Sequence, residues 1–426
     1  MAKQLLGPFK EILTMEQLPE AGPLADERMH LVRDGGLLIE DDRVLEVLNH
    51  QDFVQYQGLA EVKGSPLAHT PIKQSTVLMP GFVDAHTHMC YAGNRMEDYA
   101  RRLAGESYLQ IAERGGGIMS TVRSTRQATE DQLYGSLTMR ACEHMFGGVT
   151  TCEVKSGYGL DLETEIKMLR AIRRVNGAVG TFPLLVPTCL AAHLRPPEHR
   201  TDQQYLEFIL RRLLPQVKRD GLADRVDIYV DKGAFTADLA EGFLFQAKEQ
   251  GFHLVMHADQ FTVGGAMVAA RVSAMSADHL ERSTEREFRW LREKGVVAVA
   301  LPGSSLGLGE PFAPVRRMLD SGLCVAIASD WNPGSAPHGD LLTLAALLGA
   351  NQRLTMAETL AGITCRAARA LGLEDRGVIR AGAVADLVGF PSERYEEVLY
   401  RQGSMRPSFV MRGGRRVVKA PQAMGG

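Results

Sequence analysis

Five histidine and aspartate positions have types and spacing suited to metal-assisted hydrolysis. His86 and His88 are separated by one residue, so on a β-strand both imidazoles would lie on the same face and could share one metal ion. His257, His279 and Asp330 stand near the ends of later apolar runs. Imidazoles combined with one carboxylate suit Zn²⁺, with iron or manganese as alternatives. A metal ion held in this way lowers the pKa of water toward neutrality, which is the chemistry of hydrolysis.

These side chains follow apolar segments that must position them. In the central part of the chain, eight apolar runs of strand length alternate with helix-like stretches, such as residues 162–177, in which the apolar residues share one face. Continuous apolar strands that are each followed by a helix predict a parallel sheet, and about eight such units predict a closed (β/α)₈ barrel with its catalytic residues at the carboxyl ends of the strands. An open doubly wound sheet is the alternative, although no run is followed by a GxGxxG turn. The runs are residues 77–86, 148–156, 184–193, 225–231, 252–259, 273–280, 296–303 and 324–330.

Both ends of the chain have short strand patterns separated by turns. Residues 35–47 read as two strands around a Glu-Asp-Asp turn, and residues 377–390 and 408–420 repeat short apolar runs with glycine turns. Chain termini often lie close together in a domain. We therefore predict an α/β protein that consists of a TIM-like (β/α)₈ barrel and a small β-sandwich domain built from both termini. The predicted boundaries are residues 1–79 and 371–426 for the small domain and residues 80–370 for the barrel.

Composition excludes several classes of protein. The 426 residues include 48 Lys and Arg against 51 Asp and Glu, a net charge of −3, which argues against nucleic-acid binding because that requires a basic surface. No apolar run approaches the roughly 20 residues of a membrane span, so we expect no membrane partner. The six cysteines are scattered without a CxxC pair, which predicts reduced thiols in a cytoplasmic protein.

Several polar residues also have a plainer interpretation. Glu153 and Lys155, at the end of the second run, fit a strand-end ion pair better than a metal bridge. His193, at the end of the third run, fits either a core position or the site. Arg102 is expected on a solvated face. The remaining loop and helix histidines are expected at the surface: His30, His50, His69, His144, His199 and His338.

Longer motifs resemble a known family. The segments PGFVDAHTH, HADQ, SADHL and ASD, in this order, resemble the amidohydrolase superfamily. The segments EVKSGYGL and SDWNPGSAP narrow the resemblance to the imidazolonepropionase family, and similar stretches extend from about residue 35 onward. The resemblance implies hydrolysis of the cyclic amide 4-imidazolone-5-propanoate to N-formimino-L-glutamate in histidine degradation. A homodimer is also expected, because dimers are common among such barrels.

The same resemblance implies a role for individual residues. His86, His88, His257 and Asp330 would hold one divalent or trivalent metal ion per subunit, with zinc favoured over iron. His279 would carry protons between the attacking water and the leaving nitrogen, and Asp330 would share the acid/base work. The substrate implied by the resemblance is a small anionic molecule, and Arg95 would bind its carboxylate bidentately. The residues implied in substrate binding are Arg95, Tyr108, Tyr158, His193, Gln260, Asn332, Gly334 and Ser335.

One position departs from part of the family. Gln260 stands three residues after His257, where some family members carry glutamate. An amide can form hydrogen bonds but cannot accept a proton as a base, so its presence shifts the acid/base work to His279 or Asp330. A second metal ion is not expected, because the end of the fourth run, Asp231-Lys232, is interpreted as the entry to a loop.

Two other functions remain open. The first is a deaminase or cyclic-amide hydrolase of the same superfamily that acts on a different ring. Arg95 and Tyr158 argue against a neutral nucleobase as substrate, because it would not need a pocket for an anion. The second is a scaffold that kept the barrel and lost the chemistry, which the complete candidate metal site makes improbable.

Overall fold

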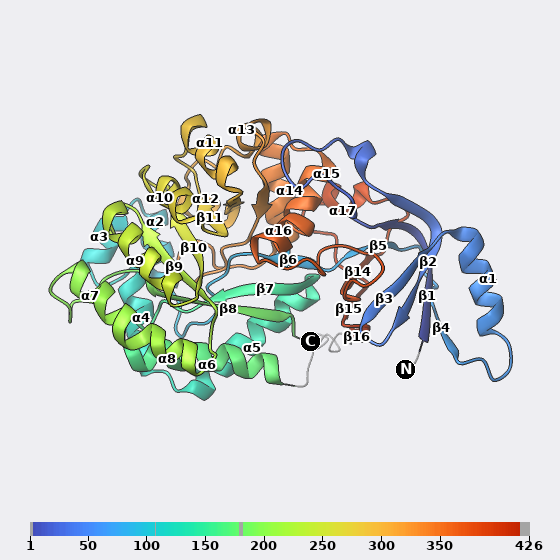
Figure 1. Ribbon diagram of the computed structural model, residues 1–426, viewed down its shortest axis with the longest axis horizontal. Coiled ribbons are helices and arrows are strands. Elements are labelled where there is room, and N and C mark those ends of the chain that lie inside the picture. Colours follow the sequence, from blue (N-terminus) through green and yellow to red (C-terminus); the bar gives the residue numbers. More distant parts are fainter. Residues whose placement is uncertain (1–2, 107, 179–181, 418–426) are drawn as a thin grey trace.

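The protein divides into a β/α barrel and a smaller sheet (Figure 1). The computed structural model describes residues 3–106, 108–178 and 182–417, without the side chains of residues 108, 109 and 112. In Figure 1 the barrel occupies the left of the view and the smaller sheet the right, with the N-terminal strands beside strands from the end of the chain.

Eight parallel strands form the barrel, which confirms the predicted fold. They pair in chain order, from the first to the eighth, and each predicted apolar run contains one of them. The first and eighth strands meet just beyond their ends, where Asp330 donates its backbone N–H to the carbonyl of His86 and His88 donates to that of Trp331. The strands are β6 (Phe82–Asp84), β7 (Val149–Lys155), β8 (Leu184–Ala192), β9 (Arg225–Val230), β10 (His253–Ala258), β11 (Ser276–His279), β12 (Val297–Ala300) and β13 (Val325–Ile327).

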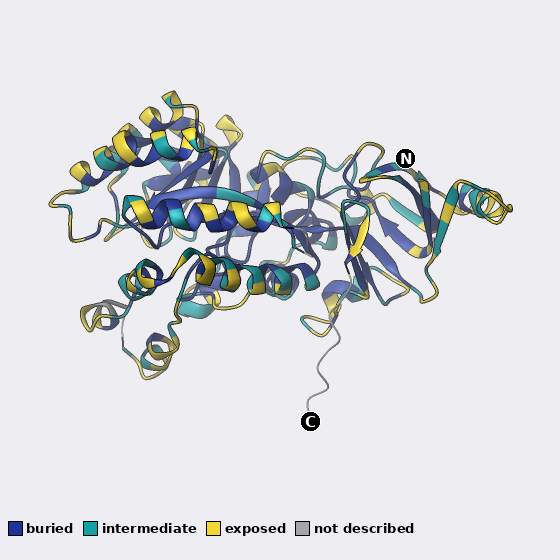
Figure 2. Ribbon diagram, turned by 90° about the horizontal axis from the view of Figure 1, so that it is seen from below, coloured by how far each residue is buried: buried dark blue, intermediate teal, exposed yellow. Residues whose placement is uncertain are grey.

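Helices surround the barrel, and their ends follow local capping signals. In α6 (Leu162–Gly177), Asp161 caps the backbone N–H of Thr164 at 2.7 Å, and the predicted apolar face is buried at Ile166, Leu169 and Ile172. Figure 2 shows the same arrangement around the barrel, with buried faces turned inward and exposed faces outward. The other α-helices described after β7 are α7 (Asp202–Phe208), α8 (Leu214–Arg219), α9 (Ala237–Glu249), α10 (Gly265–Val272), α11 (Glu285–Lys294), α12 (Pro302–Leu308), α13 (Val315–Asp320), α14 (Leu341–Gln352), α15 (Met356–Gly362), α16 (Cys365–Ala370) and α17 (Glu396–Tyr400), and a π-helical turn at Ile209–Leu213 joins α7 to α8.

Four helices separate the first two barrel strands. They are α2 (Met96–Leu103), α3 (Tyr108–Glu113), α4 (Ile118–Gln127) and α5 (Glu130–Phe146). α5 begins with a capping box between Thr129 and Gln132 and then packs against α6 and β7. The three shorter helices leave the carboxyl end of β6, so they belong to the end of the barrel where a TIM-type active site is expected.

Eight strands from the two ends of the chain form the smaller sheet. Its order is β16-β15-β14-β5-β1-β2-β3, with β4 paired to β1, and the antiparallel pairing of β5 with β14 joins the N-terminal and C-terminal segments. One helix, α1 (His50–Ala60), places Phe53 against Leu5, Leu38 and Leu48 of this sheet. The strands are β1 (Lys3–Leu13), β2 (Leu31–Glu40), β3 (Arg43–Leu48), β4 (Leu67–Pro71), β5 (Val77–Pro80), β14 (Leu387–Phe390), β15 (Phe409–Arg412) and β16 (Arg415–Val417).

The apolar run at residues 77–86 was predicted as one barrel strand, and this was wrong. The run divides at Gly81 into β5, which belongs to the smaller sheet, and β6, which begins the barrel. A Cβ atom at Gly81 would overlap the side chain of Thr150 on β7, so a glycine is required where the chain crosses between the sheets. The crossing leaves a three-residue strand directly before the His-x-His pair.

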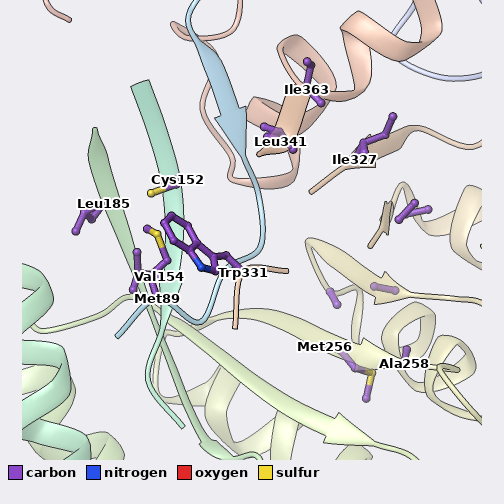
Figure 3. Close-up of a cluster of buried hydrophobic side chains, with 14 of the residues drawn as sticks. Met89, Cys152, Val154, Leu185, Met256, Ala258, Ile327, Trp331, Leu341 and Ile363 are labelled. Atoms are coloured by element: carbon purple, nitrogen blue, oxygen red, sulfur yellow. The ribbon is translucent and has the colours of Figure 1, made fainter. Parts of the chain in front are cut away.

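The buried core continues from the barrel to the loops at its carboxyl end. Trp331, which directly follows Asp330, belongs to the same buried cluster as Met89, Cys152 and Val154, and Figure 3 shows these side chains together. Packing of the Trp331 indole therefore anchors the loop that carries Asp330.

Within the described residues, no helix combines the length and apolar character that crossing a membrane requires.

Candidate active site

Three histidines and one aspartate converge at the carboxyl end of the barrel. The Nε2 atom of His88 lies 3.1 Å from Nε2 of His86 and 3.3 Å from Nε2 of His257. An Oδ1 atom of Asp330 lies 3.5 Å from Nε2 of His86 and 3.4 Å from Nε2 of His88. The four side chains come from the ends of β6, β10 and β13, so the barrel brings together residues up to 244 positions apart (86 to 330).

The donor set and its spacing fit a metal ion. Ligand atoms placed about 2.0–2.1 Å from Zn²⁺ in a tetrahedron lie about 3.3 Å from one another, which agrees with these separations. Burial lowers the pKa of all three imidazoles: the shift is large for His86 and His88, and the pKa of His257 falls to about 3. The imidazoles are therefore neutral at pH 7, which is the form that binds metals.

Two buried aspartates orient the histidine rings from behind. Asp278 contacts Nδ1 of His86 at 2.6 Å, and Asp227 contacts Nδ1 of His257 at 3.0 Å. Each carboxylate contacts the nitrogen opposite to the one that faces the site, an arrangement that fixes the tautomer and makes the ring a stronger ligand. These aspartates were not singled out from the sequence, although both lie in predicted barrel strands.

His279 lies beside this group and has an unusual backbone. Its ring centroid lies 5.4 Å from that of His257, and its φ angle is 84°. Asp330 also has a positive φ, of 54°. Non-glycine residues held in this region are strained, and such strain gathers at functional sites. Burial by itself would lower the pKa of His279. The negative charge of Glu281, whose Oε1 lies 3.5 Å from Nδ1 of His279, raises it, and Asp330 and Asp278 raise it further. The net result is a pKa above the ordinary value of histidine.

Arg95 is buried at the mouth of the barrel, and its pairing differs from a surface salt bridge. Its Nε donates to Asp98 at 2.7 Å, and the side chain is 7% exposed. The other edge of the guanidinium lies against Gly334, where a Cβ atom would overlap an Nη atom of Arg95. Arg102, expected on a solvated face, instead donates to the carbonyl of Gly334 at 3.4 Å. Burial and the positive charge of Arg95 lower the pKa of Arg102, so two guanidinium groups lie at this loop.

Tyr158 and His193 line the side of the histidine group that faces β7 and β8. The His193 ring stacks on that of His88 with centroids 5.6 Å apart, and the Tyr158 ring lies 6.0 Å from His88 and 5.6 Å from His193. Nδ1 of His193 donates to the carbonyl of Gly157 at 3.0 Å, and burial lowers its pKa. His193 is therefore a neutral imidazole with Nε2 as an acceptor.

The loop after β13 is shaped by the side chain of Asn332. Its Nδ2 donates to the carbonyl of Asp330 at 2.7 Å and to the hydroxyl of Ser335 at 2.9 Å, and its Oδ1 accepts from the N–H groups of Gly334 and Ser335. The predicted substrate-binding group at 332–335 thus lies next to Arg95, but the Asn332 amide is engaged within its own loop. Its geometry suits holding Gly334 and Asp330 in place.

Gln260 is held by two neighbours in the site. Its Oε1 accepts from the hydroxyl of Tyr229 at 2.8 Å, and its Nε2 donates to the hydroxyl of Ser304 at 3.2 Å. Asp259 turns away, as strand alternation predicts, and accepts hydrogen bonds from the start of α10. Tyr108 begins α3, but its side chain lies outside the described part of the structure.

Two interpretations of individual residues need correction. His144 was expected at the surface, but it is buried in α5, and its Nε2 lies 2.9 Å from Asp84, which also accepts from the backbone N–H of Ser329. This contact links α5 to both strands that close the barrel. Lys155 does form the expected ion pair with Glu153, at 2.6 Å, but inside the barrel and with no exposed side-chain surface. The burial of neither residue could be read from local patterns, because His144 depends on a contact between α5 and β6 and Lys155 on contacts with other barrel strands.

Glu165 was also missed by sequence reasoning, and it organises the loop that carries Tyr158. Its buried carboxylate accepts hydrogen bonds from the backbone N–H groups of Gly157, Gly159 and Leu160, the latter two at 2.8 and 2.9 Å. A carboxylate after a glycine-containing segment, in the first turn of a helix, is the local signal for this role.

We expect Glu165→Gln to destabilise the protein by about 1–3 kcal/mol, because the amide NH₂ group would face backbone donors. KM should rise more than kcat falls, since Tyr158 lies in the loosened loop. Thermal unfolding and steady-state kinetics test this, with Glu163→Gln, an exposed change in the same helix, as the control. An unchanged melting temperature and KM in Glu165→Gln would contradict the assigned role.

A parallel barrel whose strand ends gather histidines and an aspartate defines the class of amidohydrolase-type proteins, and residues 77–417 match the Amidohydrolase family. Among curated relatives, the imidazolonepropionase of Geobacillus thermodenitrificans is 37% identical over 93% of this chain and 94% of its own length. That of Symbiobacterium thermophilum is 38% identical over 96% and 95%, and that of Pseudomonas aeruginosa is 43% identical over 80% and 86%. The chain therefore belongs to the amidohydrolase family and, within it, to the imidazolonepropionases.

Solved structures agree with this fold. An atrazine chlorohydrolase from Arthrobacter aurescens in complex with zinc has a TM-score of 0.68 and 16% identity, covering 98% of this chain and 95% of its own. An adenosine deaminase from Xanthomonas campestris with bound zinc has a TM-score of 0.69 and 19% identity, with coverages of 97% and 93%. At these identities the likeness establishes the common architecture and not the substrate.

Proposed function

We propose that this chain hydrolyses 4-imidazolone-5-propanoate to N-formimino-L-glutamate, the ring-opening step of histidine degradation. The observation that carries this proposal is the 37–43% identity to imidazolonepropionases over 80–96% of the chain. The geometry supports it, because a buried arginine lies beside the loop that carries Asp330 and offers a partner for the propionate arm.

We assign one metal ion to His86, His88, His257 and Asp330, with zinc favoured over iron because of the three imidazoles and one carboxylate. An ion held by these residues would polarise the ring carbonyl and lower the pKa of water. The chain's contribution is to keep the imidazoles neutral by burial and to orient them through Asp227 and Asp278.

Substrate orientation falls to the residues around this group. The Nη edge of Arg95 near Gly334 receives the propionate, while Asp98 holds the Nε edge. Tyr158 and His193 contact the ring from the side of β7 and β8, and the neutral His193 offers Nε2 as an acceptor for a ring N–H. These contacts hold the substrate with its ring carbonyl facing the histidine group. Holding the reacting groups in this orientation lowers the activation barrier.

Proton transfer falls to His279 and Asp330. Water oxygen adds to the ring carbonyl carbon, the C–N bond breaks, and the leaving nitrogen takes a proton from His279. Gln260 cannot serve as the base, since its amide has no proton-accepting nitrogen and is held by Tyr229 and Ser304. Asp330, adjacent to both histidines of the His-x-His pair, is placed to accept the proton of the attacking water.

The cellular location and the oligomeric state of the enzyme are part of the same proposal. Cys90, Cys152, Cys189 and Cys324 are free and buried, which fits a cytoplasmic protein, and the net charge of −3 gives no basis for nucleic-acid binding. A homodimer is proposed by analogy with related barrels, and light scattering of the purified protein tests it.

Product analysis tests the function. Purified protein whose metal content has been measured is incubated with freshly prepared imidazolone propionate, and we expect N-formimino-glutamate to form in proportion to enzyme. Adenosine and a neutral cyclic amide serve as comparison substrates for the alternative deaminase or hydrolase. Turnover of either at a higher kcat/KM than the propionate would overturn the proposed substrate.

A further inference from the structure

A buried lysine lies among three carboxylates beneath the histidine group. The Nζ atom of Lys155 lies 2.6 Å from Glu153, 2.7 Å from Asp227 and 3.6 Å from Asp278. The side chains of Lys155, Asp227 and Asp278 have no exposed surface, and that of Glu153 is 1% exposed. They come from β7, β9 and β11, so the cluster exists only in the closed barrel.

The surroundings of Lys155 are those of a cation site. His86, Glu153 and Asp278 each offer one ligand atom, and these atoms all lie within 4.8 Å of one another. This second group shares His86 with the first but uses carboxylates from deeper in the barrel. Three carboxylates buried in the barrel interior require positive charge nearby. Arg225, whose Nε lies 3.4 Å from Glu153, reaches one edge of the group.

We propose that the ammonium group of Lys155 fills the place of a second metal ion and thereby keeps the centre mononuclear. The inference rests on the metal centre assigned above to His86, His88, His257 and Asp330. Lys155 lies in contact with Glu153 and Asp278, the two carboxylates of the second group, so an ion could not enter while the ammonium is present. A fixed organic cation supplies the charge without competing for the imidazoles.

Lys155 is also a positioning residue for the first metal site. Asp227 contacts both Lys155 and Nδ1 of His257, and Asp278 contacts Nδ1 of His86 while lying 3.6 Å from the same ammonium. One cation thus restrains both carboxylates that orient metal-binding rings. Burial lowers the pKa of Lys155, but Asp227, Glu153 and Asp278 outweigh burial and raise it above its ordinary value, so the group remains charged.

Metal stoichiometry tests the proposal. Wild type, Lys155→Ala and Lys155→Ser are produced in zinc- and manganese-supplemented medium and dialysed against each metal alone, and metal per chain is measured by mass spectrometry. We expect one ion in wild type and two in both variants, because the vacated volume keeps its three carboxylates. Adding Glu153→Gln to Lys155→Ala should return the count to one by removing a ligand of the second ion.

Lys167→Ala is the matched control. The Lys167 ammonium is partly buried and donates to the backbone carbonyls of Arg126 and Ala128, and among the described residues it forms no ion pair with a carboxylate, so this variant should keep one ion. One ion in both Lys155 variants would overturn the inference, and so would failure of both to fold despite added metal, since a metal ion would then not replace the ammonium. Two ions in wild type would overturn it as well. No ion in wild type would instead overturn the metal centre on which it rests.

Discussion

Replacing His279 by asparagine should lower kcat by about 10²–10⁴-fold while the protein retains about one metal ion. The reason is that His279 is proposed to protonate the leaving nitrogen, which an amide cannot do. Its ring lies beside His257 but outside the close Nε2 contacts that join His86, His88 and His257, the three imidazoles proposed to bind the metal. Asparagine is preferred to alanine because the φ of 84° at this position favours residues that tolerate the left-handed region.

The measurements are kcat on the propionate substrate and metal content of the same preparation. His279→Ala is made in parallel, and its melting temperature shows how much of any loss comes from backbone strain. If both variants lose the metal together with activity, His279 is a metal ligand and not a proton carrier. If both retain kcat within a factor of about ten, another group performs the proton transfer.

Arg95→Ala should weaken productive binding of the propionate substrate by about 2–5 kcal/mol, mostly as a higher KM. A carboxylate brought into the barrel mouth without a cationic partner is costly to desolvate. Arg95 is buried there, with its Nε edge on Asp98 and its other edge beside Gly334. Arg95→Lys should recover only part of the loss, because an ammonium does not reproduce the bidentate guanidinium.

Comparison of the substrate with its uncharged amide isolates the effect of charge. Wild type should prefer the carboxylate strongly, and Arg95→Ala should lose most of that preference. Arg101→Ala, which removes an exposed i,i+4 pair with Glu97 on the same helix, is the control and should change kcat/KM by less than about 1 kcal/mol. Equal discrimination by wild type and Arg95→Ala would show that Arg95 is not the carboxylate partner.

Much of the fold follows from local patterns in the chain. Apolar runs of strand length between amphipathic helices predicted the eight parallel strands, because a strand covered on both faces must be apolar throughout. The same patterns placed His86, His193, His257, His279 and Asp330 at strand ends, and the closed barrel brings strand ends together by its geometry. Helix boundaries such as Leu162–Gly177 also follow from capping residues and an apolar face that lie within the helix itself.

Division of the apolar run at Gly81 could not be predicted in this way. Residues 77–86 are apolar on both sides of the glycine, so local hydrophobicity fits one long strand as well as two short ones. The choice depends on β14, more than 300 residues later, which pairs with β5 and holds it in the smaller sheet. The burial of His144 in α5 has a similar origin, since its partner Asp84 ends β6, 60 residues earlier in the chain.

The amino-acid sequence by itself determined that the candidate metal-binding residues His86, His88, His257 and Asp330 stand at or just beyond the ends of apolar strands. Tertiary structure decided which of them face one another and what lies behind them. Asp227, Asp278 and Lys155 come from three different strands, and the local sequence offers Lys155 a partner in Glu153 but gives no sign that Asp227 and Asp278 lie beside it. Only closure of the barrel turns their inward faces toward one interior, where burial makes each charge depend on the others for its stability.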